Sequence, residues 1–149
     1  MHPDPERLFE QADELIDGYK NETDLRRAIS TAYYGVFHFI LRHVADTIAG
    51  TGNRSTNLYS MVYRSVEHKP LRDLCATLGS KVKSYAPMGG FGPVIAFAGL
   101  VQQLYEQRIL ADYVPVHSLI SAGRRLLWVM GERPLNILMQ LHRSSVRPL

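Results

Sequence analysis

The stretch LRRAISTAYYGVFHFILRHVA, residues 25 to 45, decides the fold of this chain. Apolar side chains recur in it every three or four positions, which is the spacing of one buried face of an α-helix. Thr23 or Asp24 can cap such a helix, and Gly50 follows it. The pattern predicts one long helix over about residues 24–49, with a buried face made of Leu25, Ala28, Ile29, Ala32, Val36, Phe39, Ile40 and Val44.

Helical periodicity continues through most of the chain, and no alternating strand pattern interrupts it. Prolines and polar loops separate the helical stretches. We therefore predict an all-α fold, an antiparallel up-and-down bundle of four to five main helices in a single domain over residues 1–149. The first predicted helix begins at Pro3 to Pro5, and the next ones cover about 24–49, 57–68, 70–82, 94–110 and 115–130. A short C-terminal helix (133–143) and a basic tail follow after about 131.

The composition is that of a globular protein, with 46% hydrophobic and 21% charged residues. The single cysteine, Cys75, excludes an intrachain disulfide framework and favours a reducing compartment. The first residues lack the basic and then apolar order of an export signal, so we expect a cytoplasmic protein. Two prolines and four glycines interrupt the uncharged run over residues 85–105, so we expect no membrane span.

Charge is unevenly distributed along the chain, whose net charge is +3. Residues 1–24 hold eight acidic and two basic side chains, whereas the remaining 125 residues hold fifteen basic and six acidic ones. A basic body of this kind can attract a polyanion such as RNA. The alternative is an acidic helix that packs over a basic neighbour. The C-terminal arginines leave the same choice between RNA contact and a solvated face: Arg124, Arg125, Arg133, Arg143 and Arg147.

No motif has the spacing of a metal site or a cofactor loop. His38 and His43 are five positions apart and therefore point about 140° away from each other on a helix. HExxH and paired cysteines are absent. The glycines of GGFG (89–92) follow no strand and precede no Lys-Ser or Lys-Thr pair, which is typical of a connector, here over residues 84–93. We expect neither a metal nor a cofactor.

Three strings carry a resemblance to a known family. RRAISTAYYGVFHF (26–39) resembles the long helix of small prokaryotic HEPN domains (higher eukaryotes and prokaryotes nucleotide-binding), which often carry an AYYA-x-FH string. VYRSVEHKPLRDLC (62–75) and RILADY (108–113) are similar to strings of one uncharacterised branch, the second to its R-x-x-ADY string. The three strings occur in the family's order. Without the family, the aromatic spacing of Tyr33 with Phe37 and of Tyr34 with His38 is more typical of a core than of a binding site.

The resemblance implies a helical bundle that is commonly a homodimer. Many HEPN proteins are metal-independent endoribonucleases, toxins with an antitoxin-like protein partner, or parts of defence systems, and others only bind nucleotide or a partner. In the active members an arginine stands four to six residues before a histidine, often with a polar residue directly after the arginine. The resemblance implies that Arg108 is the catalytic arginine. We expect Asp112, Tyr113 and His117 to support it, and Arg64, His68, Tyr34 and His38 to bind the substrate.

This chain departs from the family pattern after Arg108. Tyr113 stands where a histidine with four intervening residues would fall, Ile109 is apolar, and His117 comes only after eight intervening residues. Metal-independent cleavage needs a base for the ribose 2′-OH, which histidine supplies, and a fixed positive charge for the phosphate, which arginine supplies. Tyrosine, with a pKa near 10, is a poor base at neutral pH. Because the expected base is missing, this departure argues against RNA cleavage. We still expect Arg108 to bind phosphate.

Two arrangements can restore an imidazole, and one alternative needs none. His117 can turn back toward Arg108, or Arg64 and His68, predicted four apart on one helix face, can meet it across the bundle or dimer. Alternatively, Arg108 and Asp112 pair and only clamp the helix end. Two functions stay open: an RNA-directed protein of toxin–antitoxin or defence type, and a non-catalytic nucleotide-, RNA- or partner-binding helical dimer.

Overall fold

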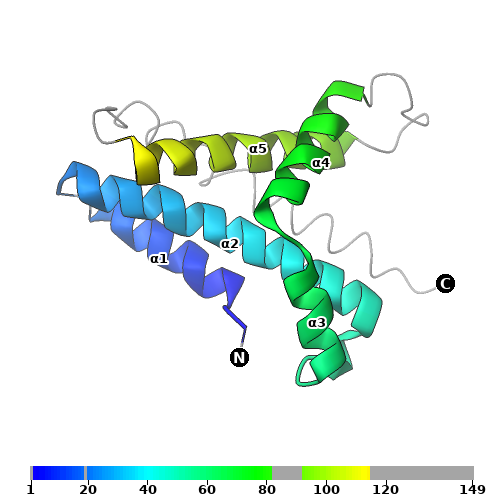
Figure 1. The fold of residues 1–149 in the computed structure, drawn as a ribbon. Coiled ribbons are helices and arrows are strands. Elements are labelled where there is room, and N and C mark those ends of the chain that lie inside the picture. Colours follow the sequence, from blue (N-terminus) through cyan, green and yellow to red (C-terminus); the bar gives the residue numbers. More distant parts are fainter. Residues whose placement is uncertain (1, 19, 82–91, 115–149) are drawn as a thin grey trace.

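The computed structural model describes residues 2–18, 20–81 and 92–114, which are helical apart from short connections and contain no strand (Figure 1). The predicted all-α fold is confirmed for these residues. The helix predicted over 115–130, the terminal helix and the basic tail lie outside them, as does most of the connector over 84–93. The elements are α1 (Pro5–Asp17), α2 (Glu22–Ala49), the short 3-10 helix η1 (Thr51–Asn53), α3 (Asn57–Ser65), α4 (His68–Lys81) and α5 (Gly92–Tyr113).

Side-chain caps fix where the first three α-helices begin. In each, the residue before the helix accepts a hydrogen bond from a backbone N–H of the first turn, which has no partner inside the helix. The capping residues are Asp4 for α1, Asn21 for α2 and Thr56 for α3. The predicted cap of α2, Thr23 or Asp24, is therefore wrong by two or three positions. Gly50 ends α2 with a φ of 87°, a conformation that favours glycine.

α2 is the central helix, because α1, α3 and α5 all pack against it. Its first half buries the predicted face through Val36. Beyond Val36 the buried face turns, and three residues predicted to be in the core are only half-buried: Phe39, Ile40 and Val44. Their places are taken by Phe37, Leu41 and Ala45. The face turns because α3 covers this half of α2 from a new side, where the buried Tyr59 donates a hydrogen bond to Asp46.

The two long neighbours of α2 both run antiparallel to it (Figure 1). On one side, the start of α1 meets the second half of α2, where Arg42 forms ion pairs with Asp4 and Glu6. These pairs agree with the acidic helix packed over a basic neighbour. On the other side, Arg26 near the start of α2 donates hydrogen bonds to the carbonyl oxygens of Leu110 and Ala111 at the end of α5.

A break between α3 and α4 overturns one prediction. The helix predicted over 57–68 ends at Ser65, Val66 is extended, and a new helix begins at His68. Pro70 lies in the first turn of α4, where its missing N–H would have had no helical partner anyway. Arg64 and His68 are therefore on different helices and do not share a helix face. Figure 1 shows α4 crossing α5, with α3 at the far end of α2.

Among the described residues, no helix combines the length and the apolar character needed to cross a membrane. The described part of the uncharged run over 85–105 belongs to α5, whose buried Ala98, Val101 and Leu104 face the core.

Gly35 provides a test of how closely α1 and α2 approach. A Cβ atom at Gly35 would lie 2.8 Å from the ring of the buried Phe9, whereas a Cβ atom at Gly99 of α5 would meet nothing within 4 Å. Gly35→Ala should lower the free energy of unfolding by about 1–2 kcal/mol, because crowding outweighs the gain in helix propensity. Gly99→Ala should raise it by up to about 1 kcal/mol. Urea unfolding followed by circular dichroism measures both, and equal effects of the two substitutions would contradict the predicted close contact.

Candidate functional site

Arg108 lies between α5 and α2 and is held by both helices. Because α5 continues to Tyr113, Arg108 and Asp112 are one helical turn apart, and Arg108 Nε lies 2.6 Å from Asp112 Oδ2. From α2, the Tyr34 hydroxyl oxygen accepts a hydrogen bond of 3.1 Å from Arg108. Only 16% of the Arg108 side chain is exposed. The predicted clamp of the helix end is therefore present in the structure.

The Arg108–Asp112 pair is a charge contact without an aligned hydrogen bond. Arg108 Nε is buried and its N–H does not point at an acceptor, although the carboxylate oxygen is close. The other carboxylate oxygen of Asp112 accepts a hydrogen bond from the Ser30 hydroxyl of α2. Asp112 therefore bridges the two helices and leaves the two-pronged geometry of arginine and carboxylate unused.

Three tyrosine rings surround the guanidinium. Its central carbon lies 6.0 Å from the ring centre of Tyr33 and 5.6 Å from those of Tyr34 and Tyr113. Cations are attracted to the faces of such rings at this range. Burial by itself would lower the pKa of Arg108, but Tyr34, Asp112 and Tyr113 outweigh it and raise that pKa. Tyr113, which is 67% exposed, thus contacts the arginine from the surface of the protein.

His68, on α4, contacts two of these three tyrosines, Tyr33 and Tyr34. Its Nδ1 is 2.8 Å from the Tyr33 hydroxyl, and its ring stacks on Phe37 at 3.8 Å and meets the edge of Tyr34 at 5.9 Å. Burial, and then the charge of Arg108, lower the pKa of His68. The imidazole is therefore neutral over a wider pH range than that of a free histidine, which suits a proton acceptor. His68 and Arg108 therefore both contact the rings of Tyr33 and Tyr34.

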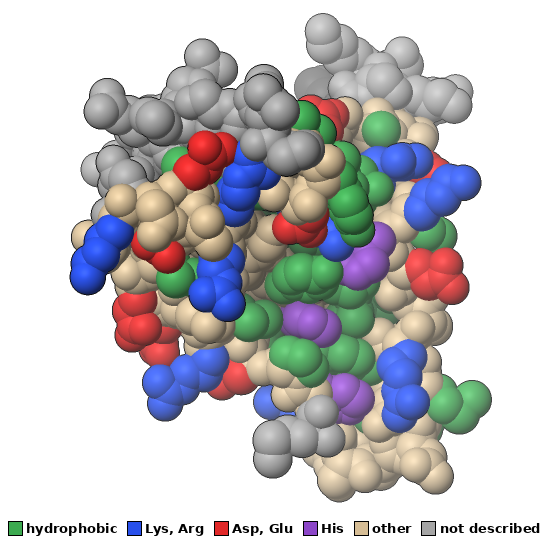
Figure 2. All heavy atoms as spheres, turned by 60° about the vertical axis from the view of Figure 1, so that its left-hand side comes forward, with side chains coloured by type: hydrophobic (Ala, Val, Ile, Leu, Met, Phe, Trp, Pro, Cys, Tyr) green, Lys and Arg blue, Asp and Glu red, His purple; other side chains and the backbone are tan. Residues whose placement is uncertain are grey.

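His68 is one end of a row of histidines and aromatic rings. His38 Nδ1 is 2.9 Å from the Tyr63 hydroxyl, and His2 stacks on Tyr63 at 4.1 Å. Burial, followed by the nearby histidines, lowers the pKa of His38. Figure 2 shows histidine side chains in a line among hydrophobic ones on one face of the molecule, with Lys and Arg side chains on either side. The row connects the Arg108 site to α3 by ring contacts between Tyr34 and His38 and between His38 and Tyr63.

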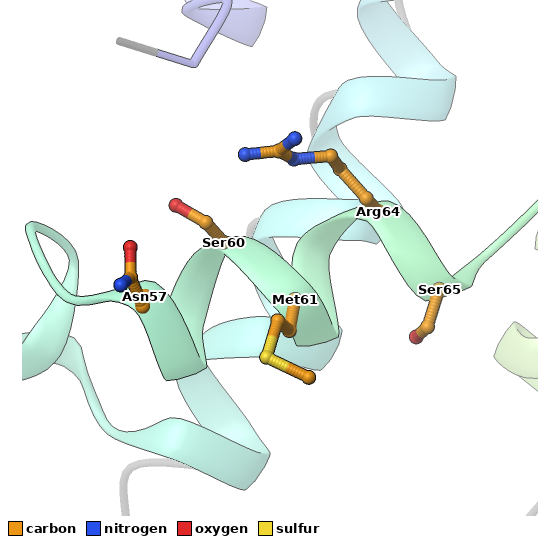
Figure 3. Close-up of a pocket in the computed structure, with 5 residues that line it drawn as sticks. All are labelled: Asn57, Ser60, Met61, Arg64 and Ser65. Carbon is orange, nitrogen blue, oxygen red and sulfur yellow. The ribbon is translucent and has the colours of Figure 1, made fainter.

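Arg64 lies apart from this site. It lines a shallow groove of about 420 Å³ along α3, where Asn57, Ser60 and Arg64 project from one side of the helix and Met61 and Ser65 from another (Figure 3). Within the described part of the chain, neither Arg108 nor His68 lines this groove. Arg64 adds positive charge near His2, whose pKa is lowered mainly by burial.

The structure thus brings together most of the predicted site residues. Arg108, Asp112, Tyr113, Tyr34 and His68 converge, and His38 joins them through Tyr34. Arg64 is separate, and His117 lies outside the described residues. Sequence reasoning missed the roles of Ser30 and of Tyr33. The signal for Ser30 was a small polar residue four positions before Tyr34, hence on the same side of α2.

The described residues contain no group of three or more histidine, cysteine, aspartate or glutamate side chains placed to hold a metal ion. Comparison of the chain with family models, with curated proteins and with solved structures finds no match in any of the three. The chemistry of the site therefore has to be argued from its own geometry.

The histidine row predicts a loss of stability in mild acid. The pKa values of His38 and His68 in the folded chain both lie below the ordinary 6.5. Below pH 6.5 these two histidines therefore bind more protons in the unfolded chain than in the folded chain. The free energy of unfolding should fall as the pH drops from about 6.5 toward 5. Asparagine can keep a hydrogen-bonding group near the place of Nδ1 without titrating, so His38→Asn with His68→Asn should flatten this slope.

Urea unfolding at a series of pH values between about 7 and 5 measures the slope. The range lies above the pH at which most carboxylates titrate, so the histidines dominate it. An equally steep slope in the double variant would contradict the assignment of the effect to these two imidazoles.

Proposed function

We propose that this chain is a HEPN-like, RNA-directed protein of the toxin–antitoxin or defence type, and that it cleaves RNA without a metal at Arg108 and His68. The observation that carries the proposal is that both side chains contact the tyrosine pair Tyr33–Tyr34, one from α5 and one from α4. A permanent cation and a neutral imidazole beside the same two rings are the two groups that metal-independent cleavage requires. His68 takes the part expected of a histidine after Arg108.

The proposed reaction is an internal transfer at the RNA phosphate. His68 takes the proton of a ribose 2′-OH through Nε2, and the 2′-oxygen attacks the adjacent phosphorus. The bond to the 5′-oxygen breaks and that oxygen takes a proton from a water molecule. The protonated His68 then releases its proton to solvent, and the products are a 2′,3′-cyclic phosphate and a free 5′-OH. This role requires the tautomer in which Nδ1 carries the hydrogen and donates it to the Tyr33 hydroxyl, 2.8 Å away. Arg108 offsets the negative charge that develops on the phosphate oxygens.

The arrangement of helices supports the family part of the proposal. α1 and α5 run antiparallel to α2, as an up-and-down bundle requires, and the AYYGVFH string lies at the centre of α2 beside the site. We propose that two copies pair as a homodimer and that an antitoxin-like protein restrains them. Exposed apolar side chains of α2 and α3, Ile48, Leu58 and Met61, are available to such protein contacts.

A second candidate function is a non-catalytic RNA- or partner-binding module. It is favoured by the closed state of Arg108, whose side chain is 16% exposed and already paired with a carboxylate. In this case Arg108 acts mainly as a link between α2 and α5, and the Lys and Arg side chains on either side of the histidine row (Figure 2) supply salt-dependent binding.

Cleavage of total RNA in EDTA separates the two functions. Wild type should cut RNA, and both Arg108→Ala and His68→Asn should reduce the rate by about 10²- to 10⁴-fold, the usual effect of losing such a group. Arg7→Gln is the charge-matched control, because Arg7 is 80% exposed on α1 and, within the described part of the chain, pairs with Glu10. It should cut RNA like wild type.

Gel-shift binding and circular dichroism of the same variants complete the test. Folded wild type that binds RNA in a salt-sensitive manner but does not cut it would support the binding module instead. Cleavage that survives in both site variants would mean that a contaminating nuclease or another site is responsible. If wild type neither cuts nor binds RNA, an RNA-directed function is refuted.

A further inference from the structure

We infer that Asp112 is a built-in competitor for the anionic ligand of Arg108, so that the site is masked until a phosphate group displaces the carboxylate. The inference rests on the proposed function, since it concerns how the same arginine is made available. The observation behind it is that an acidic side chain of the chain itself occupies the place at Arg108 where an anion would bind.

The contact that would have to be broken is a poor one for an arginine and a carboxylate. Nε of Arg108 lies 2.6 Å from Oδ2 of Asp112, but its N–H does not point at the oxygen. Another guanidinium nitrogen is committed to the Tyr34 hydroxyl. A phosphate group offers several oxygens and can accept two aligned hydrogen bonds from one guanidinium, so it can replace a single carboxylate oxygen with better geometry.

Asp112 is also placed where a helix disfavours a negative charge. It lies in the last turn of α5, near carbonyl groups that carry partial negative charge, and this last turn holds no basic residue. What keeps the carboxylate there is the charge of Arg108 and the hydroxyl of Ser30. When a stronger anion neutralises Arg108, the larger of these two attractions is lost.

The surrounding contacts allow the carboxylate to leave without disturbing the fold. The Asp112 side chain is 28% exposed, so it can rotate toward solvent. The end of α5 stays attached to α2, because Arg26 donates hydrogen bonds to the carbonyl oxygens of Leu110 and Ala111. Tyr34 keeps its hydrogen bond to Arg108 and holds the guanidinium in position.

Under masking, the apparent affinity equals the intrinsic affinity multiplied by the fraction of molecules in which Arg108 is free. Asp112→Asn removes the competing charge, keeps the shape, and retains an oxygen for Ser30. Titration with inorganic phosphate, followed by thermal unfolding, and with a short single-stranded RNA, followed by fluorescence anisotropy, should both show tighter binding than wild type, on the order of ten-fold. Asp112→Asn with Arg108→Gln should lose the gain.

Asp73→Asn is the matched control, because Asp73 pairs with Arg72 at 2.6 Å on the exposed face of α4. It removes the same charge from an arginine–aspartate pair on another helix and should leave both affinities within about two-fold of wild type. An equal gain in Asp73→Asn would show that net charge alone is responsible, and no gain in Asp112→Asn would overturn the inference, as would a gain that persists without Arg108.

Ser30→Ala provides a second variant in case Asp112→Asn does not fold. It weakens the hold on the Asp112 carboxylate and leaves Arg108 and Asp112 themselves intact, so it should give a smaller gain in the same direction. An unchanged or weaker affinity would count against the masking. The proposed function can fail separately from the masking. It fails if wild type shows no Arg108-dependent binding or cleavage of RNA, although phosphate binds more tightly to Asp112→Asn than to wild type.

Discussion

A positively charged side chain enclosed between two helices has to keep an anion beside it, and this requirement fixes how α5 lies on α2. Desolvating a guanidinium is costly unless a counter-charge and hydrogen-bond acceptors replace the lost water. Arg108 obtains the counter-charge from its own helix, from Asp112, and an acceptor from the facing helix, from Tyr34. Ser30 of α2 also binds Asp112, so all three contacts favour the observed register of the two helices. That register in turn places Tyr105 of α5 against Tyr33.

The histidines extend the same principle to the other helices. Each of the two half-buried imidazoles on the row is tied to a tyrosine hydroxyl from a different helix, His68 to Tyr33 and His38 to Tyr63. These contacts connect α2 to α4 and α2 to α3, so the polar groups that could serve chemistry also hold the helices in place. Burial raises the pKa of Tyr63 to about 12, and it raises that of Tyr33 as well, so both hydroxyls stay protonated and can donate or accept hydrogen bonds. A site built from such groups is pre-organised by the fold itself.

The sequence was most informative where the determining contacts are local. The long helix follows from apolar residues three and four apart, and the pairing of Arg108 with Asp112 follows from their spacing of one turn. It was least informative where a distant segment decides. The buried face of α2 turns after Val36 because α3 returns to cover it, and periodicity within α2 contains no information about that return. The break between the third and fourth α-helices lies earlier than predicted for a related reason, since Pro70 allows a helix to begin two residues before it as readily as at it.

The stacking of His2 on Tyr63 has a practical consequence for handling the protein. Any peptide joined ahead of His2 leaves the molecule beside the aromatic row. A polyhistidine purification tag attached there would bring additional imidazoles, with ordinary basicity and metal affinity, next to His38 and the positive side chain of Arg64. Such imidazoles can accept protons and bind phosphate on their own account, so activity measured on a tagged preparation would mix their contribution with that of the native side chains. Enzymatic removal of the tag before assay separates the two.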